Sequence, residues 1–216
     1  MKGLLVKDFR QLMQQKKSLI MIVVLAFVLN LNMDGQFIFG YLTFIGAFLV
    51  LNTMSYDEYD NTLPFLFTLP VKRETYAVEK YVFGICLCGL GWMLALIVSL
   101  VQMAAGKGMS MDLLVKSCPV YIPLFLLMLA LIIPFPLIYG REKGSIMMMV
   151  IVGVIVVLGF LAEYLLESRG VSLAGWLDSL SGLTLGSLTL ILFVAGIVAI
   201  VISALISVNY MKKKEF

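Results

Sequence analysis

The chain has 216 residues, of which 62% are hydrophobic and only 13% are charged, and its mean hydropathy is +1.04. A soluble domain carries about 25% charged residues, so this composition excludes a soluble domain and predicts an integral membrane protein. The net charge of +3 is small and gives no support to nucleic-acid binding. Six spans of about 20 residues would take up most of the chain, so we expect a single transmembrane domain over residues 1–216.

Residues 2–17 are predicted to form an amphipathic helix that lies in the plane of the membrane surface. Apolar residues such as Leu5 and Phe9 recur there at helical spacing, and polar residues such as Lys7 and Arg10 lie between them. The basic face of such a helix is attracted to anionic lipid. Membrane lipid is therefore an expected partner.

Six apolar runs follow and predict an all-α fold with six transmembrane helices. They cover residues 18–33, 37–54, 82–105, 118–139, 145–166 and 186–208. The segments between them alternate in charge, and 13 of the 16 Lys and Arg residues fall in the set that includes both termini and the loop 56–81. Because Lys and Arg concentrate on the cytoplasmic side, both termini and this loop are predicted to be cytoplasmic, with Lys107 and Arg169 outside.

The loop 56–81 is the longest polar insert and carries eight charged residues. A charge at mid-bilayer costs about 3 kcal/mol, so this loop is expected to stand in water beside the membrane. We predict a short surface helix within residues 57–68, a break at Leu69-Pro70, and a helix from about Val71 into the next span. The apolar stretch 63–67 suits a groove on another protein; the alternative is a solvated loop whose Phe residues dip into the headgroups.

Three further features lie in the second half of the chain. Residues 167–185 are amphipathic and are predicted to form a re-entrant or interfacial extracellular hairpin between the fifth and sixth spans. The pair Pro134 and Pro136 is expected to distort the fourth span near its inner end, since each ring removes a backbone hydrogen bond. Glu163 lies about one turn from the outer end of the fifth run, where it could snorkel or line an aqueous path.

Several kinds of chemistry have no residues to support them. The chain contains no histidine, which removes Ser-His and Cys-His nucleophile pairs and every metal site that needs histidine. No phosphate-binding loop of the G-x-x-x-x-G-K-[ST] type occurs. We therefore expect no catalytic, cofactor-binding or metal-binding residue in this chain.

Three short stretches carry a resemblance to a known family. They are the opening residues 1–8 (MKGLLVKD), the residues Tyr56-Asp57-Glu58, and residues 68–73 (TLPVKR) that lead into Glu79-Lys80-Tyr81. Together with the six-span pattern, they resemble the permease subunits of type-2 ABC exporters, especially small bacterial permeases encoded apart from their ATPase. One departure is Pro64, which falls where the family's coupling helix is expected to be continuous.

The resemblance implies a permease dimer in the bacterial cytoplasmic membrane with two ATPase subunits beneath it, which bind ATP and magnesium. Amphipathic peptides, antimicrobial peptides, drugs or lipid-like molecules would be exported, and the loop 56–81 would supply the coupling helix. The residues expected to meet the ATPase are Asp57, Glu58, Asp60, Leu63, Phe65, Leu66, Phe67, Lys72 and Arg73. The candidates for the substrate path are Thr43, Asn52, Thr53 and Glu163, for each of which packing is the competing interpretation.

Two other classes remain in competition with an exporter. The first is the substrate-capture membrane subunit of a vitamin importer, which also has about six spans and needs partners; the charged cytoplasmic loop argues against it. The second is a membrane enzyme. Whether the dimer is a homodimer or a heterodimer, and which substrate it carries, does not follow from these residues.

Overall fold

The structure is a computed structural model that describes residues 1–32, 37–59, 66, 68, 72–106, 110–140, 143, 144, 146, 150, 157, 161 and 185–213. Within these residues every regular element is a helix and there is no strand. The helices are α1 (Lys2–Gln14), α2 (Lys16–Asn32), α3 (Phe37–Tyr59), α5 (Arg73–Ala104), α6 (Met111–Ser117), η1 (Cys118–Val120), α7 (Tyr121–Ile132), α8 (Pro134–Tyr139) and α11 (Leu185–Lys213). The all-α prediction is confirmed for this part of the chain.

Four helices in the described part are long and apolar enough to cross a membrane, or five if the bent pair α1 and α2 is counted as one span. The four are Phe37–Glu58, Arg73–Ala104, Met111–Tyr139 and Thr189–Lys213. The apolar run 145–166 and the predicted hairpin 167–185 lie almost entirely outside the described residues. The structure therefore supports a helical protein that crosses the membrane several times. That there are six spans stays a prediction.

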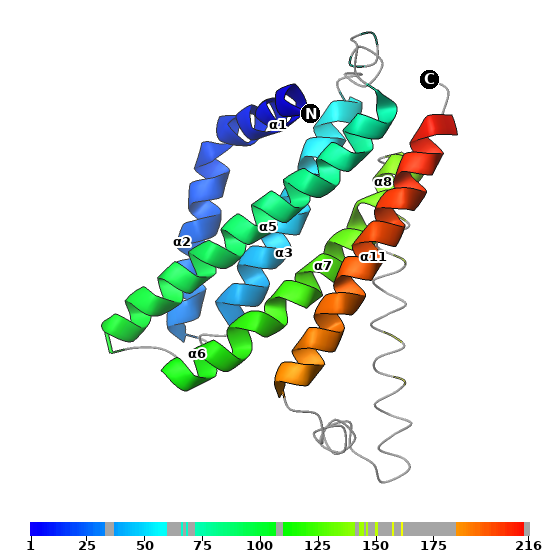
Figure 1. Ribbon diagram of the computed structural model, residues 1–216. Helices are drawn as coiled ribbons and strands as arrows, with labels where there is room; N and C mark the ends of the chain where they lie inside the picture. The colour runs from blue at the N-terminus through cyan, green and yellow to red at the C-terminus, as the bar shows by residue number, and fades with distance from the viewer. Residues whose placement is uncertain are drawn as a thin grey trace.

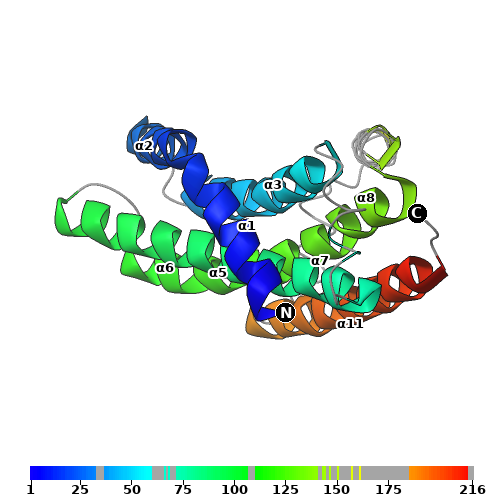
Figure 2. The same ribbon diagram turned by 90° about the horizontal axis from the view of Figure 1, so that it is seen from above.

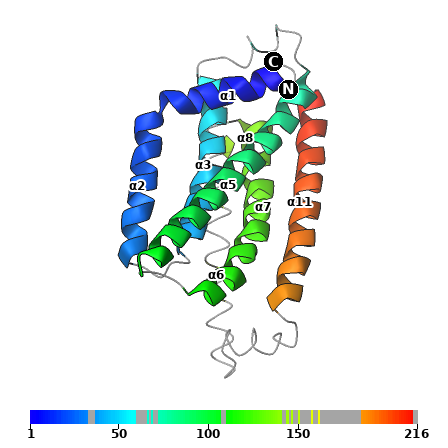
Figure 3. The same cartoon turned by 60° about the vertical axis from the view of Figure 1, so that its left-hand side comes forward.

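Helix α1 lies across one end of the bundle, which we call the α1 end (Figures 1 and 3). Its axis turns by 72° into α2, and Gln15 stands at the joint with its backbone N–H bonded to the carbonyl of Leu12. The helix expected over 2–17 thus ends early, and Lys16 and Lys17 begin α2. Seen from above, α1 passes over α5 on its way from α2 (Figure 2).

The apolar residues of α1 divide between two faces. Leu4 and Leu12 are buried in the core together with Asp8, which lies on the same stripe one turn from each. Val6 remains exposed on the opposite side, and Phe9 is partly exposed at the border between the two faces, where the centre of its ring lies 5.3 Å from that of Phe83 on α5. Because one face is occupied by the protein itself, only the other face is left for lipid.

The long helices alternate in direction. α3 runs towards the α1 end, α5 runs away from it, and the α6 to α8 series returns to it (Figures 1 and 3). α11 begins at the opposite end and finishes at the α1 end. Both α1 and the C-terminal end of α11 therefore lie at the same end of the bundle.

The fourth apolar run is broken where its prolines fall. α7 ends at Ile132 and α8 begins with Pro134 at its first position, where a missing N–H costs no helical hydrogen bond. The run also extends further upstream than predicted, because α6 begins at Met111, with the hydroxyl of Ser110 accepting from the N–H of Leu113. The expected distortion is therefore present as a break between two helices.

The core forms where α3 packs on α5 and where α7 packs on α11. Val50, Phe83, Leu129 and Ile133 are buried there. The closest approach is at Gly91 of α5, where an added Cβ would lie 2.8 Å from the carbonyl oxygen of Leu42. Small residues permit such contact between helices in lipid, where no hydrophobic driving force favours association.

Candidate functional site

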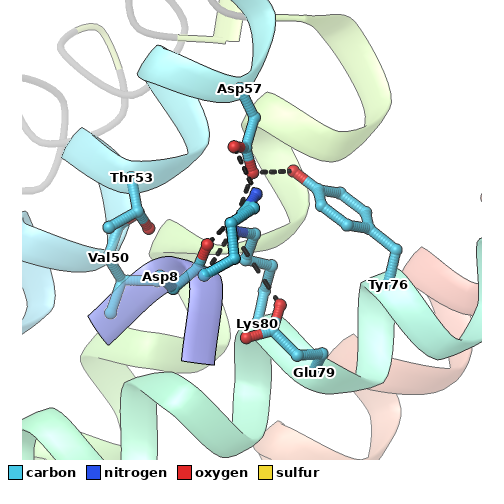
Figure 4. Close-up of polar contacts among 8 residues, drawn as sticks. Asp8, Val50, Thr53, Asp57, Tyr76, Glu79 and Lys80 are labelled. Atoms are coloured by element: carbon cyan, nitrogen blue, oxygen red, sulfur yellow. Dashed lines mark hydrogen bonds and ion pairs between the residues drawn. The ribbon is translucent and has the colours of Figure 1, made fainter. Parts of the chain in front are cut away.

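The α1 end buries a cluster of charged side chains from three helices (Figure 4). We call it the ion cluster; it consists of Lys7 and Asp8 from α1, Asp57 from α3, and Glu79 and Lys80 from α5. Each helix contributes a residue that continues its buried stripe by one turn, as Asp8 follows Leu4 on α1 and Asp57 follows Met54 on α3. The cluster therefore closes the α1 end of the hydrophobic core.

Lys80 lies at its centre, and its side chain is fully buried. The Nζ atom donates to Asp8 Oδ2 at 2.5 Å and to Asp57 Oδ2 at 2.9 Å. It also lies 5.0 Å from the centre of the Tyr76 ring, within the range of a cation–π contact. One ammonium group thus joins α5 to both α1 and α3.

Asp57 receives hydrogen bonds from three sides. Lys7 Nζ donates to its Oδ1 at 2.5 Å, and Lys80 Nζ and the hydroxyl of Tyr76 donate to its Oδ2, the latter at 3.0 Å. Lys7 Nζ is also 3.2 Å from Asp8 Oδ1. With these partners the carboxylate is compensated although Asp57 is only 3% exposed.

Such a cluster positions helices more than it adds stability. Buried ion pairs gain about as much as they lose in hydration, so a well-packed apolar replacement is often neutral. Removing one partner is different, because an uncompensated buried charge costs about 3 to 5 kcal/mol. The charges are satisfied only when α1, α3 and α5 stand in this arrangement, so the cluster specifies their relative positions.

Glu79 is the one member of the ion cluster that lacks a good partner. Its side chain is fully buried, neither carboxylate oxygen has a hydrogen-bond partner among the described residues, and the nearest cation is Lys80 Nζ at 3.9 Å. The cluster thus holds three carboxylates against two ammonium groups. Asp8 Oδ1 is likewise without a hydrogen bond.

We expect Glu79→Gln to leave the folded protein as stable as the wild type or to stabilise it. The amide removes the surplus negative charge and supplies N–H donors to a region that has unpaired acceptors. The measurement is the melting temperature of the detergent-solubilised protein, with Glu74→Gln as the control because Glu74 is about half exposed and its ion pair in the described part of the chain is with Lys212, which is also half exposed. A lower melting temperature for Glu79→Gln than for the control would show that the carboxylate has a partner it needs.

A second polar contact ties α5 to the other half of the bundle. The hydroxyl of Tyr81 lies 2.7 Å from Ser203 Oγ and 2.8 Å from Ser207 Oγ, both on α11. Ser203 in turn donates to the carbonyl oxygen of Ala130 on α7. Tyr81 follows Lys80 directly, so adjacent residues of α5 contact α1, α3 and α11.

The structure separates the residues expected to meet an ATPase. The expectation that Asp57 meets the ATPase is corrected by its position. Its carboxylate faces Lys7, Lys80 and Tyr76 inside the protein and is not a charge at an outer rim. Leu66 is also buried, within the main core, and so is not a free anchor.

The other predicted coupling residues are at or beyond the helix ends. Glu58 belongs to the last turn of α3, which continues to Tyr59, where a separate surface helix had been expected to begin. Lys72 is exposed as the N-cap of α5, and Arg73 opens that helix. Asp60, Leu63, Phe65 and Phe67 lie outside the described residues.

Three of the four candidate substrate-path residues already form hydrogen bonds within the protein. Thr43 and Thr53 are buried and donate their hydroxyls to their own helix, at Phe39 O and Val50 O. The amide of Asn52 donates to Gln15 Oε1 at 3.1 Å, across the joint of α1 and α2. Glu163 lies outside the described residues.

The internal role of the ion cluster was missed, although its residues had been noticed. Asp8 lies in the helix expected at the membrane surface, where it was counted with the polar residues, and Asp57 was expected to meet the ATPase. A signal was present, because each lies at helical spacing from buried residues, as Asp8 does from Leu4 and Leu12.

In the described part of the chain no group of three or more His, Cys, Asp or Glu side chains could hold a metal ion.

This arrangement is that of a multi-pass membrane protein in which buried ion pairs hold the apolar helices α1, α3 and α5 together at one end of the bundle. A family model described as ABC-2 family transporter protein matches residues 3–212. The chain belongs to this family and is a membrane permease component of an ABC transporter. No curated protein and no solved structure matches it.

Proposed function

We propose that this chain is the transmembrane permease subunit of an ATP-driven exporter and is powered by a separate ATPase subunit that binds ATP and magnesium. The observation that carries the proposal is α5, which runs unbroken from Arg73 to Ala104 and is held at its start by the ion cluster. Its cargo would be amphipathic peptides, antimicrobial peptides, drugs or lipid-like molecules.

A continuous helix is a suitable element to transmit force. At 1.5 Å per residue, the 32 residues of α5 extend over about 48 Å, enough to cross a bilayer from the α1 end. Because Lys80 contacts both Asp8 and Asp57, a displacement of the start of α5 would also move α1 and α3. An ATPase that moved the residues before Arg73 would therefore act on three helices together.

The docking element in this proposal is the stretch between α3 and α5. Its anchors are Leu63, Phe65 and Phe67, with Asp60 at the rim, since Asp57 and Leu66 are occupied inside the protein. Lys72 and Arg73 add basic charge where this stretch enters α5. The loop 56–81 thus remains the proposed coupling loop, but its contacts with the ATPase are limited to residues 60–73.

In the membrane we place the α1 end in the cytoplasm, with both termini inside. The described Lys and Arg residues of α1, of the start of α2 and α5, and of the end of α11 lie there, whereas Lys116 of α6 lies at the opposite end. A crossing by residues 145–166 would join α8 to α11, because these helices end and begin at opposite ends of the bundle. Six spans in the bacterial cytoplasmic membrane would result.

The active unit in this proposal is a dimer, either of two identical chains or of two different ones. The substrate path would run along the interface and use the second and fifth spans. On α3 the exposed pair Phe44 and Phe48, with ring centres 4.9 Å apart, offers an apolar surface. Asn52 is the polar candidate beside it that is not bonded to its own helix.

The importer alternative receives no support from the family match. A substrate-capture subunit meets its coupling protein through small-residue membrane helices and does not need a charged loop. Co-purification of this chain with a soluble ATPase through residues 60–73 tests the proposed function. If the ATPase bound equally well after this loop was replaced by a Gly-Ser linker, an ATPase-coupled exporter of this design would be excluded.

We expect Phe65→Ala or Phe67→Ala to weaken ATPase binding by more than about tenfold. Buried aromatic anchors dominate interfaces at about 2 kcal/mol or more each, whereas rim charges such as Asp60 contribute about 0 to 1. Asp60→Asn is therefore the matched control, with a smaller effect that is confined to low salt. Pull-down of the ATPase at equal membrane expression is the measurement; wild-type binding by both Phe variants would contradict the coupling role.

We expect a cysteine at position 72 to be protected from an impermeant thiol reagent in intact cells, and a cysteine at position 116 to react. Both side chains are exposed, and they lie at opposite ends of the bundle. Cys86, Cys88 and Cys118 are free and are first replaced by alanine. Labelling of position 72 but not 116 would reverse the proposed orientation.

A further inference from the structure

Helix α1 and the end of α3 enclose a polar pocket of about 470 Å³. The residues that bear on its chemistry are Gly3, Lys7, Arg10, Gln11, Gln14 and Asp57. The pocket is at the α1 end, on the outer side of the ion cluster, which supplies Lys7 and Asp57 to its wall. It is therefore a surface site of which one wall is fixed by buried contacts.

Of the two cations that line this pocket, Arg10 has no counter-ion among the residues that the structure describes. The other two charged groups of its wall, Lys7 and Asp57, are bonded to each other at 2.5 Å and both belong to the ion cluster. Arg10 is exposed and has no ion-pair or hydrogen-bond partner among the described residues, nor have the amides of Gln11 and Gln14. A guanidinium and two amides together present N–H donors, which suits a phosphate group.

An apolar groove adjoins this pocket and shares Val6 and Arg10 with it. The groove measures about 560 Å³ and is lined otherwise by Lys2, Leu5, Phe9 and Met13. Phe9 is 38% exposed and Met13 is 66% exposed. Polar donors and an apolar surface thus lie side by side on one helix, joined by the stem of Arg10.

The setting of α1 limits what can occupy both compartments. The helix lies across the end of the bundle, at 72° to α2, where headgroups meet acyl chains in a bilayer. We propose that α1 binds an anionic phospholipid, with its phosphate in the polar pocket on Arg10 and an acyl chain along the groove of Phe9 and Met13. A negative headgroup charge complements Arg10, which has no partner among the described residues, and Lys2 of the adjoining groove is a second exposed cation near it.

This is a defined site, and it differs from a general attraction of the basic helix to a charged membrane. A general attraction would be shared by every exposed cation near α1, including Lys16 and Lys17 at the start of α2. The defined site depends on Arg10 and on the volume beside Gly3. A Cβ on Gly3 meets nothing within 4 Å, so a larger residue there would enter the pocket without disturbing the core.

The experiment measures lipid binding to the full chain in detergent by native mass spectrometry and by the change in melting temperature. The probes are dioleoyl phosphatidylglycerol, dioleoyl phosphatidylcholine and inorganic phosphate. Phosphatidylglycerol is expected to be retained and to raise the melting temperature, and the other two probes are not. Arg10→Gln and Gly3→Leu should each reduce its retention about tenfold or more, as expected for loss of a charge-assisted hydrogen bond or of the space for the headgroup.

The matched controls are Lys16→Gln and Lys17→Gln, which remove the same charge outside the pocket. Retention close to wild type in both controls supports the site. An equal loss in the controls would overturn it in favour of general attraction, and full retention by Gly3→Leu would show that the pocket is not used. Equal retention of phosphatidylcholine, or stabilisation by inorganic phosphate alone, would also overturn it.

Discussion

Lys80→Met is expected to destabilise the protein by about 3 to 5 kcal/mol, the largest effect of any single change at the ion cluster. Methionine fills a similar volume, but Lys7 would then be the one cation left among the described residues to face the carboxylates of Asp8, Asp57 and Glu79. Charges that are removed from water and lack partners cannot regain their hydration without separating the helices. The measurement is the melting temperature of the solubilised protein together with its yield in the membrane.

Two further variants make this test specific. Lys116→Met breaks an ion pair with Asp112 of 2.8 Å on an exposed helix face, where such a pair contributes about 0 to 1 kcal/mol. The double variant Lys80→Met with Asp57→Asn restores the charge balance of the wild-type cluster and should recover much of the lost stability. If Lys80→Met melted like Lys116→Met, the cluster would have no structural role.

Gly91→Ala is expected to be the most damaging of the small changes within the spans. The new methyl group would lie 2.8 Å from the carbonyl oxygen and 3.3 Å from the carbonyl carbon of Leu42. Both are backbone atoms, so no side chain can turn aside, and α3 and α5 have to move apart. Overpacking of this kind costs about 1 to 3 kcal/mol, and the melting temperature and the ATPase activity of the assembled transporter should both fall.

Gly89→Ala is the matched control on the same helix, two residues away. A Cβ at Gly89 meets nothing within 4 Å, and alanine has the higher helix propensity at both positions. The difference between the two variants therefore isolates the contact with Leu42. Equal stability of the two would mean that α3 and α5 are not in backbone contact at Gly91.

Much of the membrane architecture was predictable from local properties. The apolar runs at 37–54 and 186–208 fall within α3 and α11, and the run 82–105 ends one residue beyond α5. A stretch of apolar residues long enough to cross a bilayer is favourable there regardless of its neighbours. The helix expected from about Val71 into the third span begins at Arg73, because Lys72 has an extended backbone and forms the N-cap. The amphipathic N-terminal helix and its turn into the membrane were also expected, although the turn lies at Gln15 and not after residue 17.

The partners of the charged residues were not predictable in the same way. A charge at the end of an apolar run can stand in water or fold inwards, and the local sequence is compatible with both. Asp57 was expected at a surface because its neighbours Glu58 and Asp60 are polar. Its burial depends on Lys7, which is 50 residues away, and on Lys80, which is 23 residues away.

The sequence by itself determined that this is a helical multi-pass membrane protein, where the runs that form α3, α5 and α11 lie, and in which segments Lys and Arg gather. Hydropathy and charge act on each segment separately, so these properties do not require knowledge of the contacts. Tertiary structure alone decided that α1, α3 and α5 share Lys80, that Tyr81 reaches Ser203 and Ser207, and that Gly91 touches Leu42. A buried charge or a close backbone approach is favourable only when its partner from a distant segment is in place, and helix packing is what brings that partner there.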